Sequence, residues 1–191
     1  MCSSDLEESE HTPPTERVEL PRVIGGVVDT LALQARAKGI AVEVDAPANL
    51  PPVSGDSDQL AQVFQNLIDN AIKYGKPQGK VRVVIRVAAE PPVRVAAALG
   101  RRMDLEARDW VSIAVADDGD GIPREHLPRL TERFYRVDAA RSRQLGGTGL
   151  GLAIVKHILN RHRGALAIDS EPGRGSIFAV WLPSRVNSVT D

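Results

Sequence analysis

The chain has 191 residues, and its 24 basic and 25 acidic side chains give a formal net charge of −1, which argues against a protein whose main role is to coat nucleic acid or an anionic membrane. Its apolar fraction of 42% is typical of a soluble globular protein, and its length suits one domain. A single cysteine excludes an internal disulfide framework and any metal site built from several cysteines.

The N-terminal quarter predicts a leader, a helix, a strand and a loop. Residues 1–15 are acidic and polar, which is typical of a disordered leader or the end of a linker. Apolar residues recur at helical spacing over 21–38, and Gly39 follows as a stop signal. Alternating apolar and polar residues over 40–45 predict a strand, and the proline-rich stretch 47–55 predicts a loop.

The central part predicts a helix over 56–74, with cap candidates at its start, and strands over 81–87 and 110–116. Between those strands, the stretch 88–109 contains two adjacent prolines and several arginines. This composition predicts a solvated loop, interpreted as a tolerated insertion.

The last third predicts a loop-rich stretch over 117–147, a helix over 148–163, and two strands joined by the turn Pro-Gly-Arg-Gly at 172–175. The strands and helices mix without strict alternation, which predicts an α+β fold: a two-layer α/β sandwich with a mixed sheet packed against helices. We expect one domain over 16–184, followed by a C-terminal tail over 185–191.

Three polar residues follow one edge of the helix over 56–74. Asn66, Asn70 and Lys73 fall at i, i+4 and i+7, beside the apolar face of the helix. An amide oxygen is a ligand that suits Mg²⁺, and a lysine one turn further on can reach a phosphate. Tyr74 ends the helix, where its ring can lie against a base. The same pattern also fits a solvated polar edge.

Acidic residues and glycines follow the strand over 110–116. Asp117, at the strand end, can accept a hydrogen bond from an exocyclic amino group, and the glycines at 119 and 121 let the backbone pass close to a flat ring. An ordinary acidic turn has the same composition. A calcium loop is disfavoured because the terminal glutamate and the flanking helices of an EF-hand are missing.

Four glycines precede or open the helix over 148–163. Exposed amides at a helix N-terminus make an anion site, and the apolar helix that follows would hold that site rigidly. No frame gives the glycine spacing of a Rossmann or a P-loop site. A flexible hinge packed on the core is the alternative interpretation.

Four motifs occur in a fixed order: N-L-x-x-N-A-x-K-Y at 66–74, D-x-G-x-G with the following isoleucine at 117–122, R-F-Y-R at 133–136 and G-T-G-L-G-L at 147–152. This order resembles the ATP-binding catalytic domain of bacterial sensor histidine kinases. The resemblance covers nearly the whole chain, including the closing S-E-P-G-R-G-S-I-F stretch at 170–178. It implies the Bergerat fold, with ATP and Mg²⁺ as cofactors.

The resemblance assigns the adenine end of a nucleotide site to five residues besides Tyr74, which would flank the base. Asp117 would bind the adenine amino group, Gly119 and Gly121 would shape the floor, and Ile122 would pack nearby. Ser176 would support the carboxylate through its hydroxyl group.

It assigns the phosphate end to residues from three segments. Asn70 would be the Mg²⁺ ligand, with Asn66 lining the same pocket. Lys73 and Arg136 would be the catalytic residues that neutralise the phosphates, and Tyr135 would lie with Arg136 in a lid that is mobile without nucleotide. Backbone amides would come from a glycine-rich run: Gly147, Thr148, Gly149, Leu150 and Gly151.

The resemblance also implies partners. In this family the acceptor histidine is followed by an acidic residue, and none of His11, His126, His157 and His162 is. The acceptor would therefore lie on a separate dimerisation domain of a parent kinase, for onward transfer to a response regulator. We expect this fragment to be cytoplasmic and monomeric, to bind ATP and to show little transfer alone, within a homodimeric parent that is either free or anchored in the inner membrane. No nucleic-acid partner is expected.

Two features depart from the family pattern. Asp118 stands where asparagine is usual, which would place a negative charge close to the nucleotide, and the stretch 88–109 is longer than the usual hairpin. Other readings of the same fold stay open. A clamp ATPase is disfavoured because no glutamate lies between Asp58 and Lys80. An anti-sigma-factor or serine kinase and a nucleotide-regulated pseudoenzyme are the others.

Overall fold

The computed structural model describes residues 14–100 and 109–184, so most of the expected leader and all of the expected tail over 185–191 lie outside the described residues. Along the chain the described elements are β1 (Glu16–Val18), α2 (Leu20–Ala37), β2 (Ala41–Asp45), β3 (Val53–Gly55), α3 (Ser57–Tyr74), β4 (Lys80–Ala88), α4 (Val93–Leu99), β5 (Asp109–Asp117), η2 (Arg124–Arg129), α5 (Ala139–Gln144), α6 (Gly151–Arg161), β6 (Ala165–Glu171) and β7 (Gly175–Ser184).

The described strands form one mixed sheet with the order β1-β3-β7-β5-β4-β2, and β6 also pairs with β7. β2 and β4 run parallel, and the other neighbouring strands run antiparallel. β5 lies between β4 and β7, and Asp117 at its end is opposite Val81 on one side and Ser176 on the other. The last residue of β5 is therefore fixed by two strand ladders.

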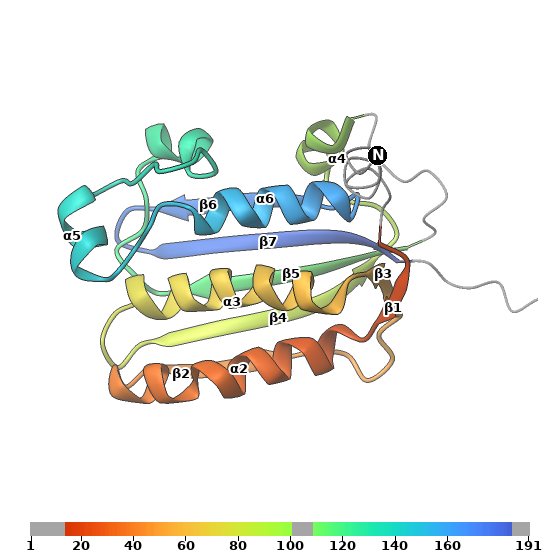
Figure 1. The fold of residues 1–191 in the computed structure, drawn as a ribbon, viewed down its shortest axis with the longest axis horizontal. Helices are drawn as coiled ribbons and strands as arrows, with labels where there is room; N and C mark the ends of the chain where they lie inside the picture. The colour runs from red at the N-terminus through yellow and green to blue at the C-terminus, as the bar shows by residue number, and fades with distance from the viewer. Residues whose placement is uncertain (1–13, 101–108, 185–191) are drawn as a thin grey trace, which may run out of the picture.

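Three helices, α2, α3 and α6, cover one face of this sheet (Figure 1). The core lies between these two layers, which confirms the predicted α+β two-layer sandwich. The predicted apolar face of α3 is fully buried; it consists of Leu60, Val63, Phe64, Leu67 and Ala71, joined by Ile68 and Ile72. Burial of each large side chain contributes about 1.5–3 kcal/mol to the transfer free energy that holds α3 on the sheet.

The stretch 88–109 is not simply a solvated loop, because it contains α4. Val95 and Leu99 of α4 are buried in a second cluster with Trp110 and Ala165, against which Trp181 also packs. These sheet residues alternate with core residues such as Val111 and Leu182, so α4 covers part of the sheet face opposite the three large helices. The helix was missed because its alanine-rich sequence shows little periodicity. Residues 101–108 lie outside the described part.

Other departures from the sequence expectations are local. The loop expected over 47–55 contains β3, and the loop-rich stretch 117–147 contains the short helices η2 and α5. The helix expected from residue 148 begins at Gly151. In the described ranges, no helix combines the length and apolar character needed to cross a membrane.

His162 joins the end of α6 to the start of α3. Its Nδ1 donates to the Ile158 carbonyl oxygen (2.8 Å), and its Nε2 accepts from the Asp56 N–H group (3.0 Å). Asp56 in turn caps α3 by accepting from the N–H groups of Asp58 and Gln59. The ring is 3% exposed and must be neutral to accept at Nε2.

We predict that His162 makes stability depend on pH. Burial lowers the pKa of His162 below the ordinary value of 6.5. The fold therefore favours the neutral ring, so the stabilisation is complete above about pH 6.5 and is lost as the pH falls through the lowered pKa. His162→Ala should lower the free energy of unfolding at pH 8 by about 2 kcal/mol, because the Asp56 N–H loses its acceptor, and by less at pH 5. Urea unfolding at both pH values measures this.

The matched control is His157→Ala, because His157 lies on the same helix and is exposed. It should change the free energy of unfolding by less than about 0.5 kcal/mol at either pH. An equal cost of His162→Ala at pH 5 and pH 8 would contradict the assigned protonation state.

Candidate functional site

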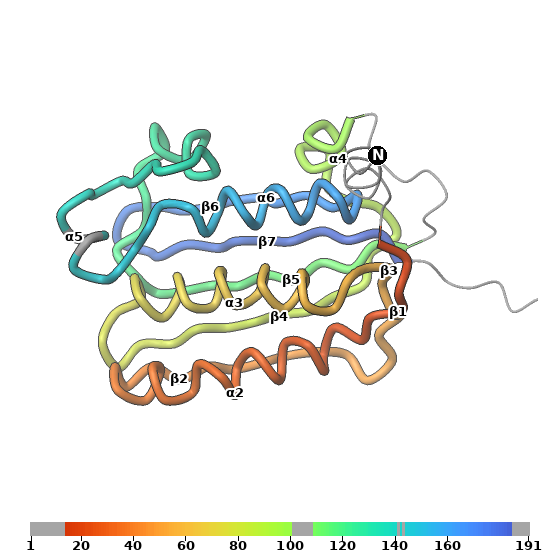
Figure 2. Tube along the Cα trace, in the orientation of Figure 1, coloured from red at the N-terminus to blue at the C-terminus, as the bar shows by residue number. Residues whose placement is uncertain are grey.

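A cavity of about 300 Å³ lies where the end of α3, the end of β5, the η2–α5 segment and the start of α6 meet. In Figure 2 the chain leaves β5, follows a long path that includes α5, and returns to α6. Residues of this segment line one side of the cavity. The volume is in the range of small-molecule sites.

The structure brings most of the sequence-predicted site residues to this one cavity. Those that line it are Asn66, Asn70, Lys73, Tyr74, Asp117, Gly121, Ile122, Tyr135, Arg136, Gly147, Thr148, Gly149, Gly151 and Ser176. Gly119 and Leu150 are not among the lining residues. The positions agree with a shared site, and the role of each residue stays a proposal.

Asp117 presents a carboxylate held by backbone donors. The Gly119 N–H donates to its Oδ1 (2.8 Å), and the Ser176 N–H also donates to the carboxylate. Burial raises the pKa of Asp117, and the nearby charge of Asp118 raises it further, while these N–H groups and Lys38 lower it. The result is a half-buried acceptor with a fixed direction.

Gly119 lies behind this carboxylate, which explains why it does not line the cavity. A Cβ atom at this position would overlap the Tyr74 carbonyl oxygen and crowd Asp117 Oδ1. Gly121 has φ +72°, and a Cβ there would overlap the Glu171 carbonyl oxygen of the β6–β7 hairpin. The two glycines thus let the loop after β5 pack between α3 and the hairpin.

The hydroxyl group of Ser176 does not make the expected contact with Asp117. It lies 2.9 Å from Ser170 Oγ, and Ser170 Oγ accepts from the Ile122 N–H (2.8 Å) and donates to the Gly175 carbonyl oxygen (2.9 Å). The serine pair therefore holds the loop after β5 on the hairpin, and the contact of Ser176 with the carboxylate is made by its backbone N–H.

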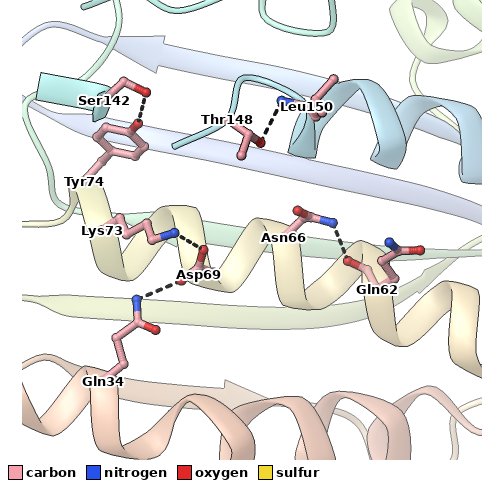
Figure 3. A network of polar contacts seen from close by, with 9 residues as sticks. All are labelled: Gln34, Gln62, Asn66, Asp69, Lys73, Tyr74, Ser142, Thr148 and Leu150. Atoms are coloured by element: carbon pink, nitrogen blue, oxygen red, sulfur yellow. Dashed lines mark hydrogen bonds and ion pairs between the residues drawn. The ribbon is translucent and has the colours of Figure 1, made fainter. Parts of the chain in front are cut away.

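The stripe on α3 is more charged than the sequence motif suggested. Asp69 lines the cavity, pairs with Lys73 at 2.7 Å and accepts from Gln34 of α2 at 2.8 Å (Figure 3). Asn66 donates to the Gln62 carbonyl oxygen (2.9 Å), and its Oδ1 faces Gly151, where a Cβ would come within 2.7 Å. Asp69 could have been found from helical spacing, because it lies at i+3 from Asn66.

The glycine-rich run reaches α6 without a side-chain cap on its first turn. Gly149 has φ +72° and packs against Phe134, whose N–H donates to its carbonyl oxygen (2.8 Å). The N–H of Leu150 donates to Thr148 Oγ1 (3.3 Å), which explains why this amide is not presented to the cavity as expected (Figure 3). The start of α6 retains the polarity that favours an anion.

Residues 123–146 supply the other wall of the cavity. Arg136 is half-buried, and its Nε atom is buried without a hydrogen-bond partner among the described residues. Tyr135 lies between two side chains of η2: its hydroxyl is 2.5 Å from His126 Nδ1, and the Arg129 guanidinium lies 4.3 Å from its ring centroid. Ser142 of α5 lies 3.5 Å from the Tyr74 hydroxyl (Figure 3). Mobility of this segment stays a prediction.

The sequence missed several lining residues besides Asp69. They are Asp120, Leu130, Val137, Asp138, Ser142, Leu152, Ile154 and Phe178. Leu152 and Ile154 carried a signal, since they belong to the apolar helix after the glycines. Ser142 and Asp138 had none, because their positions depend on how the segment folds over the cavity.

Asp118 does not line the cavity, contrary to the expectation that its charge would lie close to a ligand. Its Oδ2 accepts from the Lys80 N–H (3.0 Å), and the missing side chain of Gly79 makes room for the carboxylate. The reason is the alternation of a strand end, which turns Asp118 away from its neighbour Asp117.

The donor groups suit Mg²⁺ in one particular mode. No group of three or more histidine, cysteine, aspartate or glutamate side chains with metal-binding geometry occurs among the residues the structure describes. Mg²⁺ commonly takes one or two protein oxygens together with phosphates and water. The amide oxygens of Asn70 and Asn66 at the cavity wall match that mode, so the site fits Mg²⁺ brought by a phosphate ligand.

Comparisons with known proteins agree with this geometry. Residues 55–186 match the family described as histidine kinase-, DNA gyrase B- and HSP90-like ATPases. The phosphate regulon sensor protein PhoR of Pseudomonas aeruginosa is 36% identical over 97% of this chain, and the sensor-like histidine kinase SenX3 of Mycobacterium tuberculosis is 36% identical over 98%. The chain spans 38% and 41% of the length of these relatives.

Solved structures give the same result. The mycobacterial sensor histidine kinase MprB superposes with a TM-score of 0.66 at 29% identity, over 90% of this chain and 98% of that one. Full-length ShkA in complex with AMPPNP superposes with a TM-score of 0.70 at 25% identity, over 90% of this chain and 31% of that one. The expected Bergerat fold is thereby confirmed.

We predict that Asp117→Asn raises stability near neutral pH. The pKa of Asp117 is raised above its ordinary value of 3.8, so the fold disfavours the ionised form. Ionised Asp117 therefore lowers the free energy of unfolding above its folded pKa and has no effect below about pH 3.8, where it is protonated in both states. Asn retains an oxygen that accepts from Gly119. Urea unfolding at pH 7.5 and 4.5 should show a larger gain at pH 7.5.

The exposed Asp169 on β6 provides the control, since Asp169→Asn should leave the free energy of unfolding nearly unchanged at both pH values. A loss of stability in Asp117→Asn at pH 7.5 would show that the carboxylate has a structural role.

Proposed function

The chain belongs to the family of histidine kinase-, DNA gyrase B- and HSP90-like ATPases, and its relatives are sensor histidine kinases; on this basis we propose that it binds ATP with Mg²⁺ and donates the γ-phosphate to a histidine on a separate dimerisation domain. The observation that carries the proposal is the shared cavity. It has a directed carboxylate, Asp117, at one end and amides, cations and an uncapped helix start at the other.

The base end suits adenine. Asp117 accepts two backbone hydrogen bonds, which leaves further lone pairs on the carboxylate to accept from an exocyclic amino group. Gly121 and Ile122 offer a flat, partly apolar wall, and Tyr74 at the end of α3 offers a ring. A base with a keto group in place of the amino group would face the carboxylate with an acceptor and bind poorly.

The phosphate end suits a polyanion. The Arg136 Nε is a buried donor with no partner among the residues that the structure describes. An anion that accepted a hydrogen bond from it would remove the cost of burying an unpaired donor. Lys73 forms an ion pair with Asp69 at 2.7 Å. When ATP binds, its ammonium group can leave this carboxylate and pair with a phosphate. The first turn of α6, which no side chain caps, adds its dipole.

These residues account for what the protein must do in phosphoryl transfer, in which positioning and charge neutralisation dominate. Asn70 and Asn66 would hold Mg²⁺, which when bound neutralises phosphate charge. Lys73 and Arg136 would stabilise the charge on the transferred group, and residues 123–146 would exclude water. The acceptor nitrogen attacks the γ-phosphorus, and ADP leaves.

The partners follow from the relatives. The sensor kinases are more than twice as long as this chain, so we propose that the acceptor histidine belongs to the rest of a parent kinase and that a response regulator receives the phosphoryl group. In that arrangement this domain is cytoplasmic, whether or not the parent is anchored in a membrane.

Nucleotide binding tests the site. Asp117→Asn should weaken ATP binding at least about tenfold at pH 7.5, because one charge-assisted hydrogen bond is lost. Asn70→Ala should remove most of the gain in affinity that Mg²⁺ gives and leave Mg²⁺-free binding within about threefold of wild type. Isothermal titration calorimetry with ATP, with and without Mg²⁺, measures both, and Asp169→Asn is the control. If both variants bound ATP with wild-type affinity, the assignment of the site would be wrong.

Phosphoryl transfer is tested by supplying radiolabelled ATP and a histidine-bearing helical dimerisation domain. We expect acid-labile label on that domain and little label on this chain alone. Arg136→Ala should lower the transfer rate about 100-fold, because a preorganised cation at the developing charge is lost. Label that survives acid on a serine substrate would instead favour a serine kinase of the same fold, and ATP binding without any transfer would favour a pseudoenzyme.

A further inference from the structure

Two charged residues that do not line the cavity make hydrogen bonds to backbone groups in and beside one short connection. This stretch, here called the α3–β4 connection, comprises residues 75–79 between α3 and β4. Lys38 ends α2, and Asp118 follows Asp117 at the end of β5. Lys38 lies outside the four sequence motifs. Asp118 lies within the second motif, but the motif does not predict its contact with the start of β4.

Lys38 holds the start of the α3–β4 connection. Its Nζ donates to the carbonyl oxygens of Ile72 (2.9 Å) and Lys73 (2.5 Å), two of the last carbonyl groups of α3. Its own carbonyl oxygen accepts from the Gln78 N–H (3.1 Å). A cation at the C-terminus of a helix is favoured by the helix dipole. One residue thus ends α2, caps α3 and ties down the turn that follows.

Asp118 holds the far end. Its Oδ2 accepts from the Lys80 N–H (3.0 Å), where β4 begins. A Cβ at Gly79 would overlap the Asp118 carboxylate, so the carboxylate occupies a position that only glycine leaves open. Its Oδ1 is buried without a partner in the described part of the chain. The Asp118 carboxylate is therefore partly removed from solvent, and its charge acts on Asp117.

The α3–β4 connection follows the end of α3, which contacts the loop that orients Asp117. The Tyr74 carbonyl oxygen packs against Gly119, which donates to Asp117, so a shift of the end of α3 would move the donor that orients the carboxylate. The same last turns of α3 carry Asn70, Lys73 and Tyr74.

We propose that Lys38 and Asp118 are positioning residues of the nucleotide site, which fix the α3–β4 connection and act on the Asp117 carboxylate with charges of opposite sign. Lys38 favours the ionised carboxylate, and Asp118 opposes it. This inference rests on the proposed function, because it assumes that Asp117 contacts the base.

The effect on protonation has the expected directions. The charge of Lys38 lowers the pKa of Asp117, and the charge of Asp118 raises it, in addition to the larger effect of burial. Other charged or titratable groups face the same region from the packed elements: Asp120 on the loop after β5, Asp69, Lys73 and Tyr74 on α3, Lys80 on β4, Glu171 and Arg174 beside the β6–β7 turn, and Tyr135, Arg136 and Asp138 in the segment 123–146. Variants of Lys38 and Asp118 leave all of these in place.

The test compares Lys38→Met, Asp118→Asn and the double variant with wild type. Asn keeps an acceptor for the Lys80 N–H, so Asp118→Asn removes charge and preserves geometry. In the ligand-free protein, the ¹³C carboxyl titration of Asp117 should move to higher pH in Lys38→Met, to lower pH in Asp118→Asn and back toward wild type in the double variant.

The ATP affinity of each variant should change in line with the ionisation of Asp117. The ratio of variant to wild-type Kd at each pH removes the ionisation of the nucleotide itself. At pH 7.5, Lys38→Met should bind about fivefold more weakly, because the end of α3 loses two hydrogen bonds, and Lys38→Arg should restore most of this loss. As the pH is lowered toward the Asp117 titration, the ratio should rise further for Lys38→Met and fall for Asp118→Asn.

Lys76→Met is the control for net charge, because Lys76 is exposed in the same connection. It should leave the Asp117 titration and the Kd unchanged. Shifts of the Asp117 titration in the same direction in both charge variants, or no shift in either, would overturn the inference. If Asp117→Asn binds ATP like wild type, the proposed function fails instead, whatever the titrations show.

Discussion

The structure depends on the way Asp117 is fixed at the end of the central strand. β5 pairs with β4 on one side and β7 on the other, and both ladders end at this residue. Two backbone N–H groups hold its carboxylate, and the loop after it is pinned to the β6–β7 hairpin by Ser170 and by the hydrogen bond from Gly173 to the Asp120 carbonyl oxygen (2.7 Å). These backbone donors offset part of the burial that disfavours its charge, and the pKa of Asp117 is still raised on balance.

The two ends of the cavity are formed by different kinds of structural element. The end proposed for the base consists of strand ends, tight loops and glycines, so its geometry is set by the fold. The end proposed for the phosphates consists of side chains on α3, the start of α6 and the segment 123–146. There Lys73 is paired with Asp69, and Arg136 has a donor that is unpaired in the described part of the chain. In the proposed function, the rigid end would select the ligand and the other end would neutralise its charge, which suits an enzyme that must release its product.

The sequence predicted the elements that carry strong periodicity and the residues that belong to ordered motifs. The apolar face of α3 and the strands β4 and β5 followed from the spacing of apolar residues, and β7 followed from the turn that precedes it. Asp69 lies at helical spacing from Asn66 and could have been added to the motif, but its contact with Gln34 of α2 could not be foreseen. Ser142 could not be placed, because its position depends on the path of the chain over the cavity. Leu150 and Gly119 were placed in the site by motif, whereas their N–H groups are used inside the protein. Asp118 was misplaced because neighbouring residues at a strand end point in opposite directions.

The cluster beneath α4 has a consequence for how this chain can be observed. Both tryptophans of the sequence, Trp110 and Trp181, belong to it, on the sheet face away from the cavity. Intrinsic tryptophan fluorescence therefore reports whether α4 is docked on the sheet, and it does not report directly on a nucleotide in the cavity. To follow ligand binding in the cavity by tryptophan fluorescence, a tryptophan would have to be introduced near the cavity.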